Sequence, residues 1–154
     1  MSSGPLDRLS QFPIGASLSS DDRAKLAAIA TLESHSLGIT LFVEGDPSDS
    51  VYVVVEGRID LTMRRPGRPD ATLLTLGPGD LVGWSALTSD ARRVASAHVG
   101  APAVLVRLPR APLLALCEQD HDIGYSVTRL AFAEVGRRLH ETRLQLLDMY
   151  GATR

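Results

Sequence analysis

The chain has 154 residues and a net charge of −2, so its length fits one domain with its own core, and no basic excess is available to attract nucleic-acid phosphates. No apolar run approaches the roughly 20 residues of a membrane span, and the N-terminus lacks the basic and apolar layout of a secretory signal. We therefore expect one soluble, cytoplasmic domain that binds neither nucleic acid nor a membrane.

The N-terminal part is expected to hold one helix. Residues 1–17 are predicted to be a flexible segment, and the folded domain is predicted to span residues 18–154. Ser19 offers an N-cap with an acidic residue three positions later, and the apolar residues from Leu26 onward follow helical spacing. The pattern predicts a short amphipathic helix over residues 20–33.

Short aliphatic runs separated by glycine and proline fill residues 37–108. Glycine allows the positive φ of tight turns, and proline fixes the first corner of a turn. Many short strands with regular turns are typical of an antiparallel roll or barrel. We therefore predict a mainly β fold, a jelly-roll-like antiparallel β-roll, with an N-terminal helix and a long C-terminal helix. The predicted strands are Ile39–Val43, Val51–Val55, Arg58–Met63, Ala71–Leu76, Val94–Val99 and Ala103–Leu108.

Two C-terminal helices are predicted over residues 110–150. The first is short and covers Arg110–Cys117, and the second runs from Asp120 or Asp122 to Tyr150, with acidic residues at its start and a glycine after its end. At about 1.5 Å per residue, the second helix is longer than a domain of this size is wide. Part of it must therefore project or pair with another helix.

Apolar residues recur along the long helix at steps of three and four, with small residues in its middle. One stripe can pack on the roll while an adjacent stripe meets a partner helix. We expect a two-fold homodimer through this helix, because a two-fold pair is the commonest assembly. The alternative is a helix that lies wholly on its own domain.

No catalytic or metal site is predicted, and we expect the chain not to be an enzyme. Cys117 is the only cysteine, and its apolar neighbours indicate a buried thiol without a redox or nucleophilic role. The histidines stand apart in the sequence and do not have the paired spacing of metal ligands. They are His35, His98, His121 and His140.

Several stretches carry a resemblance to a known family. They are residues 41–57, residues 76–83, the run Arg93-Val-Ala-Ser96, and residues 136–143. In this combination the chain resembles the cyclic-nucleotide-binding domain family, and in particular the sensor domains of the bacterial catabolite-activator and fumarate-nitrate regulators. The resemblance covers nearly the whole chain and implies a β-roll that senses a cyclic nucleotide.

The resemblance also implies a phosphate-binding cassette, which matches residues 82–87 and is closed by the run that begins at Arg93. In such a cassette, backbone groups and a guanidinium hold the cyclic phosphate, because both kinds of group bind anions. The residues implied to offer backbone groups are Gly83, Ser85, Ala86 and Val94, and Arg93 is implied to supply the charge.

Trp84 departs from the family pattern, which has at this position a glutamate that accepts the ribose 2′-hydroxyl proton. An indole donates one hydrogen bond and cannot accept as a carboxylate does. The loss of one hydrogen bond to a charged group weakens binding by about 10- to 150-fold. An indole at the pocket mouth can instead stack on a base.

Arg93 needs a partner when no anion is bound, because an unpaired buried guanidinium is costly. Asp90 is a nearby candidate. The alternative is that Arg93 is satisfied within the protein or faces water, and that the pocket is vestigial. On the base side, the resemblance aligns Thr142 with a purine-contacting hydroxyl and Arg143 with a serine. A solvent-facing threonine is the alternative there.

These residues predict a regulatory module that binds cyclic AMP, cyclic GMP or a related phosphate-bearing ligand, weakly or with altered specificity because of Trp84. The alternative is a ligand-free protein-interaction or scaffold domain with a degenerate pocket. In the related regulators a helix-turn-helix follows the central helix, whereas this sequence ends four residues after Tyr150. We therefore expect no DNA binding and an unidentified protein partner.

Overall fold

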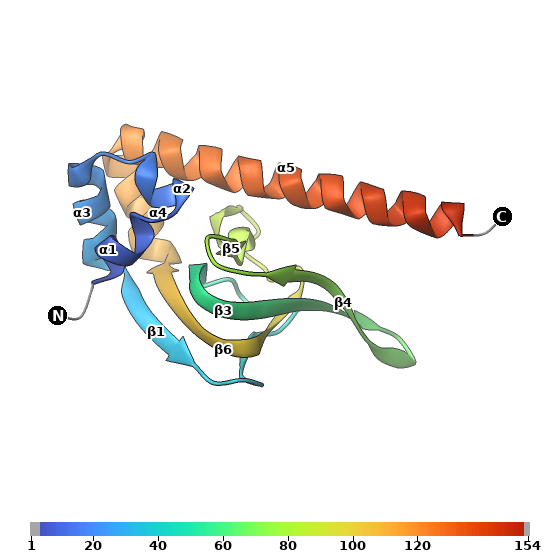
Figure 1. The fold of residues 1–154 in the computed structure, drawn as a ribbon. Helices are drawn as coiled ribbons and strands as arrows, with labels where there is room; N and C mark the ends of the chain where they lie inside the picture. Colours follow the sequence, from blue (N-terminus) through green and yellow to red (C-terminus); the bar gives the residue numbers. More distant parts are fainter. Residues whose placement is uncertain (1–3, 153–154) are drawn as a thin grey trace.

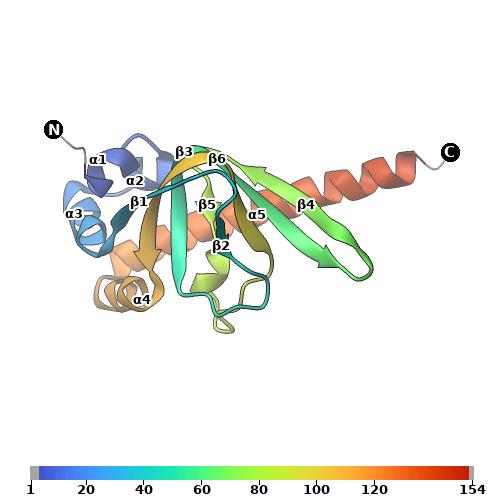
Figure 2. The same cartoon turned by 90° about the horizontal axis from the view of Figure 1, so that it is seen from below.

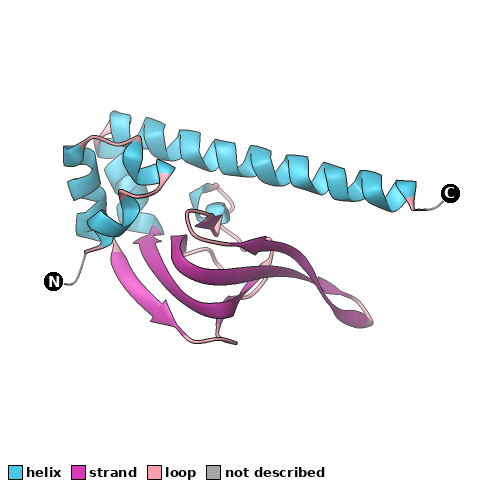
Figure 3. Ribbon diagram, in the orientation of Figure 1, coloured by secondary structure: helices cyan, strands magenta, loops and turns pink. Residues whose placement is uncertain are grey.

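The chain folds into a roll of six antiparallel strands, with four helices gathered at one end and one long helix along one side (Figures 1 and 3). The computed structural model describes residues 4–152. The predicted class is confirmed, because a mainly β roll is flanked by N-terminal helices and a long C-terminal helix.

The N-terminal segment differs from the prediction. Residues 1–17 were expected to be flexible, but Pro5–Leu9 forms α1 and Pro13–Ala16 forms α2. The Leu9 side chain is buried against the helix–sheet core, and this burial stabilises the segment. Residues 1–3 of this prediction lie outside the described part of the chain.

Helix α3 (Ser20–Ile29) begins as predicted, since the Ser19 side chain accepts a hydrogen bond from the Asp22 backbone N–H. It does not extend to residue 33. Residues Thr31–His35 instead form strand β1, which pairs with the last strand of the roll. The sheet therefore begins before residue 37, because backbone pairing with a distant strand outweighs local helical spacing.

The structure has six strands, as many as predicted, but their bounds differ. They are β1, β2 (Thr40–Phe42), β3 (Ser50–Arg65), β4 (Arg68–Leu76), β5 (Leu81–Val82) and β6 (Ser96–Pro109). Each of β3 and β6 joins two predicted runs, because the glycines between those runs bend the ladder through register shifts without ending it. At Gly57 φ is +88°, and a Cβ there would overlap the Pro102 carbonyl oxygen.

The core has two layers, one inside the roll and one between the roll and the helices. Alternate residues of β3 face opposite layers of the core. Both faces of its first half are buried, and that half is therefore apolar on both faces. Inside the roll lie Tyr52, Val54, Ile59, Leu61, Leu76, Val82, Ala97, Val99, Ala103 and Leu105. Between roll and helices lie Leu9, Leu18, Leu26, Val51, Val53, Val55, Leu81, Ala86, Val106, Leu108, Leu113 and Ile123.

Helices α4 (Arg110–Gln119) and α5 (His121–Gly151) are joined at Asp120, whose carboxylate caps α5 by accepting from two backbone N–H groups. Helix α5 leaves the helical cluster and runs across the roll beyond its far end, as Figures 1 and 2 show. Within residues 4–152, no helix is long and apolar enough to cross a bilayer.

Candidate functional site

The segment between β5 and β6 forms the centre of the site. Trp84–Leu87 is a single turn of 3₁₀ helix, and Gly83 precedes it with φ +80°. A Cβ on Gly83 would overlap the Arg93 guanidinium at Nη1, so glycine is required both by the backbone conformation and by the space. The Ala86 N–H already donates to the Gly83 carbonyl at 3.1 Å. One of the implied backbone donors is therefore engaged within the turn.

Arg93 points into the protein and is 3% exposed. Its Nη2 donates to the Ser50 carbonyl at 2.8 Å, and its Nη1 donates to the Gly83 carbonyl at 3.2 Å. The guanidinium carbon lies 3.9 Å from the centroid of the Phe42 ring, which adds a cation–π contact. Its Nε is buried and has no hydrogen-bond partner among the described residues.

The carboxylate that pairs with Arg93 is Asp49, at 3.4 Å, and not Asp90, which the sequence suggested. Asp90 is exposed on the loop after the 3₁₀ turn. Burial lowers the pKa of Arg93 below its usual range, and the charge of Asp49 partly opposes this shift. A guanidinium stays protonated in proteins, so the site keeps a buried positive charge.

A pocket of about 390 Å³ opens between the roll, the 3₁₀ turn and α5. Its roll side is apolar, and apart from the indole N–H of Trp84 its polar side-chain groups come from α5. The lining residues are Leu61, Met63, Leu73, Leu74, Trp84, Val94, Ala95, Arg138, Glu141, Thr142 and Gln145.

The structure brings only some of the implied site residues to this pocket. Trp84, Val94 and Thr142 line it, whereas Gly83 and Ser85 line a much smaller cavity of about 20 Å³ beside it. Ala86 is fully buried in the core, and Arg143 is exposed on α5 and does not line the pocket. The Ser85 hydroxyl is engaged with Ser48 at 2.7 Å.

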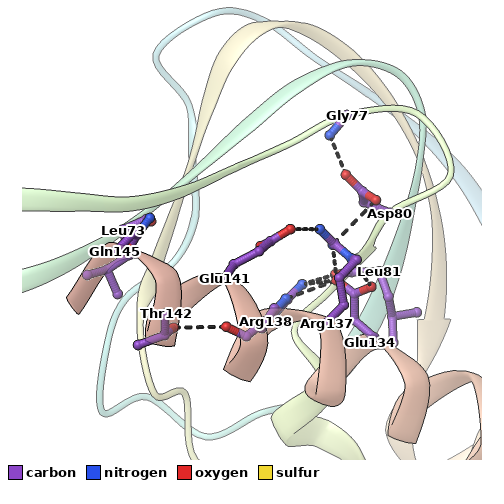
Figure 4. Close-up of polar contacts among 10 residues, drawn as sticks. All are labelled: Leu73, Gly77, Asp80, Leu81, Glu134, Arg137, Arg138, Glu141, Thr142 and Gln145. Atoms are coloured by element: carbon purple, nitrogen blue, oxygen red, sulfur yellow. Dashed lines mark hydrogen bonds and ion pairs between the residues drawn. The ribbon is translucent and has the colours of Figure 1, made fainter. Parts of the chain in front are cut away.

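A cluster of charged side chains fastens α5 to the roll at the rim of the pocket (Figure 4). Arg138 bonds the Glu134 carboxylate at 2.9 Å and donates to the Leu81 backbone carbonyl. Arg137 reaches Asp80 on the roll at 3.5 Å and Glu141 on its own helix at 2.7 Å. Burial lowers the pKa of Arg138. The hydrogen bond that Arg137 donates to Glu134 raises the pKa of Arg137.

Sequence reasoning missed the roles of Arg138 and Glu141. The available signal was the helical spacing, since Glu134 stands four residues before Arg138, and Arg137 stands four residues before Glu141. That spacing marks ion pairs on one face of a helix, but it does not reveal that this face covers a pocket.

Comparison with known proteins gives the family of this chain. The family model described as cyclic nucleotide-binding domain matches residues 32–120. The chain belongs to this family. The cyclic AMP receptor protein of Thermus thermophilus is 32% identical over 109 residues, which cover 71% of this chain and 49% of that protein. The chain thus spans about half the length of this curated relative.

Solved structures of this cyclic nucleotide-binding fold superpose closely on the chain. One, from Geobacter metallireducens and described as cyclic nucleotide-binding, has a TM-score of 0.79 at 25% identity and covers 88% of this chain and 98% of its own. Another is the N-terminal domain of a transcriptional regulator from Streptomyces coelicolor, with a TM-score of 0.69 at 29% identity, covering 91% of this chain and 95% of its own.

A second groove, of about 430 Å³, lies on the other side of Trp84, between α4 and α5 of this cyclic nucleotide-binding domain. Cys117 lines it and is half-buried, where the sequence suggested a buried thiol. Burial raises the pKa of Cys117, so the thiol form is favoured. Within residues 4–152, no group of three or more His, Cys, Asp or Glu side chains is arranged to hold a metal ion.

Proposed function

We propose that this domain is a regulatory sensor, not a catalyst, which binds a cyclic nucleotide or a related phosphate-bearing ligand between the Trp84 turn and α5. The observation that carries the proposal is the buried guanidinium of Arg93, which has no partner at Nε among the described residues. Arg93 lines neither cavity itself, but it bonds to the carbonyl of Gly83, which lines the smaller one. An unpaired buried donor carries a free-energy penalty, and an anionic acceptor removes it.

Ligand occupancy would be transmitted through α5. Four polar residues of the pocket wall belong to this helix. One of them, Arg138, donates a hydrogen bond to the Leu81 carbonyl and so joins the helix to the roll. A ligand that fills the pocket contacts both sides at once and so favours one position of α5 over another. Regulation by a shift of this helix is therefore the expected output.

Binding of cyclic nucleotides is expected to be weak. Trp84 lines the pocket in place of the family's glutamate, and Arg93 must give up contacts with two backbone carbonyls to reach a phosphate. Each hydrogen bond to a charged group that is lost weakens binding by about 10- to 150-fold.

The alternative function is a ligand-free interaction domain that acts through a protein partner. The observation in its favour is the pairing of Arg93 with Asp49, Ser50 and Gly83, which leaves the guanidinium largely satisfied without an anion. In this case the pocket at Trp84 no longer binds a ligand.

Titration calorimetry with cyclic AMP, cyclic GMP and cyclic di-GMP separates the two functions. The sensor function predicts saturable heat with at least one of them at micromolar to millimolar concentration. The absence of heat with all three at millimolar concentration would exclude cyclic nucleotides and favour the interaction domain.

We also propose that two copies pair through α5. Exposed residues recur on this helix every seven positions, with a second series three positions later, which is the pattern of a two-stranded coiled coil. The first series is Tyr125, Phe132, Leu139 and Leu146, and the second is Thr128, Val135, Thr142 and Met149. A second copy of the same helix matches this seam, because a two-fold axis joins like with like.

A further inference from the structure

A second guanidinium, that of Arg107 on β6, lies beside the buried guanidinium of Arg93. Both contact the carboxylate of Asp49, since Arg93 Nη2 is 3.4 Å from Oδ1 and Arg107 Nη2 is 3.5 Å from Oδ2. Both also bond to Ser50, the first residue of β3. Arg107 Nε donates to the Ser50 hydroxyl at 2.6 Å, and Arg93 Nη2 donates to the Ser50 carbonyl at 2.8 Å. The same two neighbouring residues therefore hold two cations.

The carboxylate that the two cations share is the most exposed member of the group. The side chain of Asp49 is 69% exposed, whereas that of Arg107 is 34% exposed and that of Arg93 is buried. An exposed carboxylate loses little free energy when it exchanges one partner for another, because ion pairs in water are weak. Burial is the main cause that lowers the pKa of Arg93, and the nearby charge of Arg107 lowers it further.

We propose that Arg107 is a positioning residue for the phosphate site at Arg93, which takes over the carboxylate of Asp49 when Arg93 turns to a bound phosphate. The assignment rests on the proposed sensor function, since it describes how the cation of that site is released. Arg107 itself lines neither cavity at the Trp84 turn, so it acts through Asp49 and not by contact with a ligand in them.

The physical reason is competition between two anions for one guanidinium. A ligand phosphate and the Asp49 carboxylate both accept from Arg93, and their negative charges repel each other. Arg107 offers the displaced carboxylate a second fork, which is already held in place by its bond to the Ser50 hydroxyl. Without Arg107 the carboxylate has only water as an alternative partner, so it competes more strongly with the ligand.

Glu33 on β1 has the opposite effect, because it competes with Asp49 for Arg107. Its Oε1 lies 3.8 Å from Arg107 Nη1, and its Oε2 lies 2.9 Å from Nε2 of His35. Removal of the Glu33 charge leaves Arg107 free to attract Asp49 more strongly. The two neighbours of Arg107 should therefore change the affinity of the site through the same cation.

The test is the dissociation constants of cyclic AMP and cyclic GMP, measured by titration calorimetry on the full chain. Arg107→Met removes the charge and keeps the aliphatic stem, and it should weaken both nucleotides by the same factor, about two- to fivefold. The factor is shared because the two ligands have the same cyclic phosphate. Arg107→Lys keeps a positive charge and should retain part of the affinity.

Glu33→Gln should change affinity in the opposite direction and tighten both nucleotides. A variant that only disturbed the fold would weaken binding, so a gain separates the two roles. Arg58→Met is the matched control for Arg107→Met, because it removes an exposed guanidinium from the same roll, where Arg58 pairs with Asp60 at 3.2 Å. It should leave both dissociation constants unaltered.

A double-mutant cycle with Asp49→Asn tests whether Arg107 acts through the carboxylate. The neutral amide competes less for Arg93, so Asp49→Asn should tighten both nucleotides. In this background the charge at position 107 has no carboxylate to attract, and adding Arg107→Met should have no further effect. If Arg107 acted on the ligand by its own charge or only stabilised the roll, the loss would be the same in both backgrounds.

The outcomes separate the two levels of the proposal. An unchanged affinity in Arg107→Met, or an equal loss with and without Asp49→Asn, overturns the role of Arg107 and leaves the sensor function standing. Failure of the unmodified chain and of Asp49→Asn to bind either nucleotide at millimolar concentration overturns the sensor function and the role of Arg107 with it.

Discussion

Two residues, Arg93 and Trp84, have opposite effects on the affinity of the site for a cyclic nucleotide. Arg93 is a buried cation beside the pocket, which favours an anionic ligand, but it is also bonded to two carbonyls and paired with Asp49. Trp84 removes an acceptor from the pocket wall and contributes an apolar surface in its place. The balance between these contacts sets the affinity for any cyclic nucleotide.

Replacing the indole should restore affinity. Trp84→Glu supplies the acceptor for a ribose hydroxyl, and affinity for the preferred cyclic nucleotide is expected to rise by about 10- to 150-fold in calorimetry. Trp84→Gln is the matched control, because glutamine has the shape of glutamate but no charge, and its gain in affinity should be smaller. Adding Arg93→Ala to Trp84→Glu should abolish the gain. Equal affinities of Trp84→Glu and the unmodified chain would show that the pocket geometry, not the missing carboxylate, limits binding.

Gly83 should tolerate no side chain. Its φ of +80° and the overlap of a Cβ with Arg93 Nη1 both oppose a side chain at this position. Gly83→Ala is expected to lower the free energy of unfolding by about 2–4 kcal/mol in urea denaturation. Gly67→Ala shares a positive φ, +69°, but meets nothing within 4 Å, so it isolates the backbone cost of about 1 kcal/mol. Similar losses in both variants would mean that Arg93 moves aside freely.

At the scale of elements, the contact between α5 and the roll is the part of the fold that can change. Helix α5 is held at its start by buried Ile123 and by the Asp120 cap, whereas its second half touches the roll through charged side chains. A hold made of a few ion pairs and hydrogen bonds is weaker than a packed apolar interface. The second half of α5 is therefore the expected moving element.

Arg138 should be the strongest of these contacts. Its side chain is 14% exposed and that of its partner Glu134 is 11% exposed, so the pair is largely removed from water. Arg138→Met is expected to lower the free energy of unfolding by about 1–3 kcal/mol and to speed amide hydrogen exchange over residues 134–145. Arg143→Met, at an exposed position of the same helix, should change stability by less than about 0.5 kcal/mol. Unchanged exchange in Arg138→Met would show that the charged cluster does not hold the helix.

At the scale of the whole molecule, α5 extends past the roll and exposes large apolar side chains. Phe132 is 80% exposed and Leu139 is 50% exposed. Exposure of several such residues along one helix is typical of a surface that pairs with another protein. The seven-residue period makes a second α5 the expected partner.

Pairing through α5 predicts a mass of two chains in solution by sedimentation or light scattering. Phe132→Lys together with Leu139→Lys places charges in the seam and should give a single chain at the same concentration. Ala133→Lys introduces the same charge at an exposed position beside the seam and should leave the dimer intact. A single chain for the unmodified protein at tens of micromolar would contradict the pairing.

The sequence predicted the parts of this protein that depend on neighbours in the chain. Glycine and proline marked the turns, alternating and continuous apolar runs marked the strands, and Ser19 marked the start of α3, because backbone conformation and capping are local. The same local signals failed at residues 31–33, where pairing with β6 replaced the expected helix, and at residues 5–16, where burial of Leu9 stabilises helices. The family motif around Gly83 and Arg93 was also readable from the chain alone.

Only the tertiary structure decided which groups meet. Asp49, and not Asp90, pairs with Arg93, because the curl of the roll brings the start of β3 under the Trp84 turn. The pocket face of α5, and with it the unpaired oxygen of Glu141, depends on how the helix is turned about its axis as it crosses the roll. Helical spacing fixes which side chains share a face, but the packing of distant apolar residues fixes where that face points.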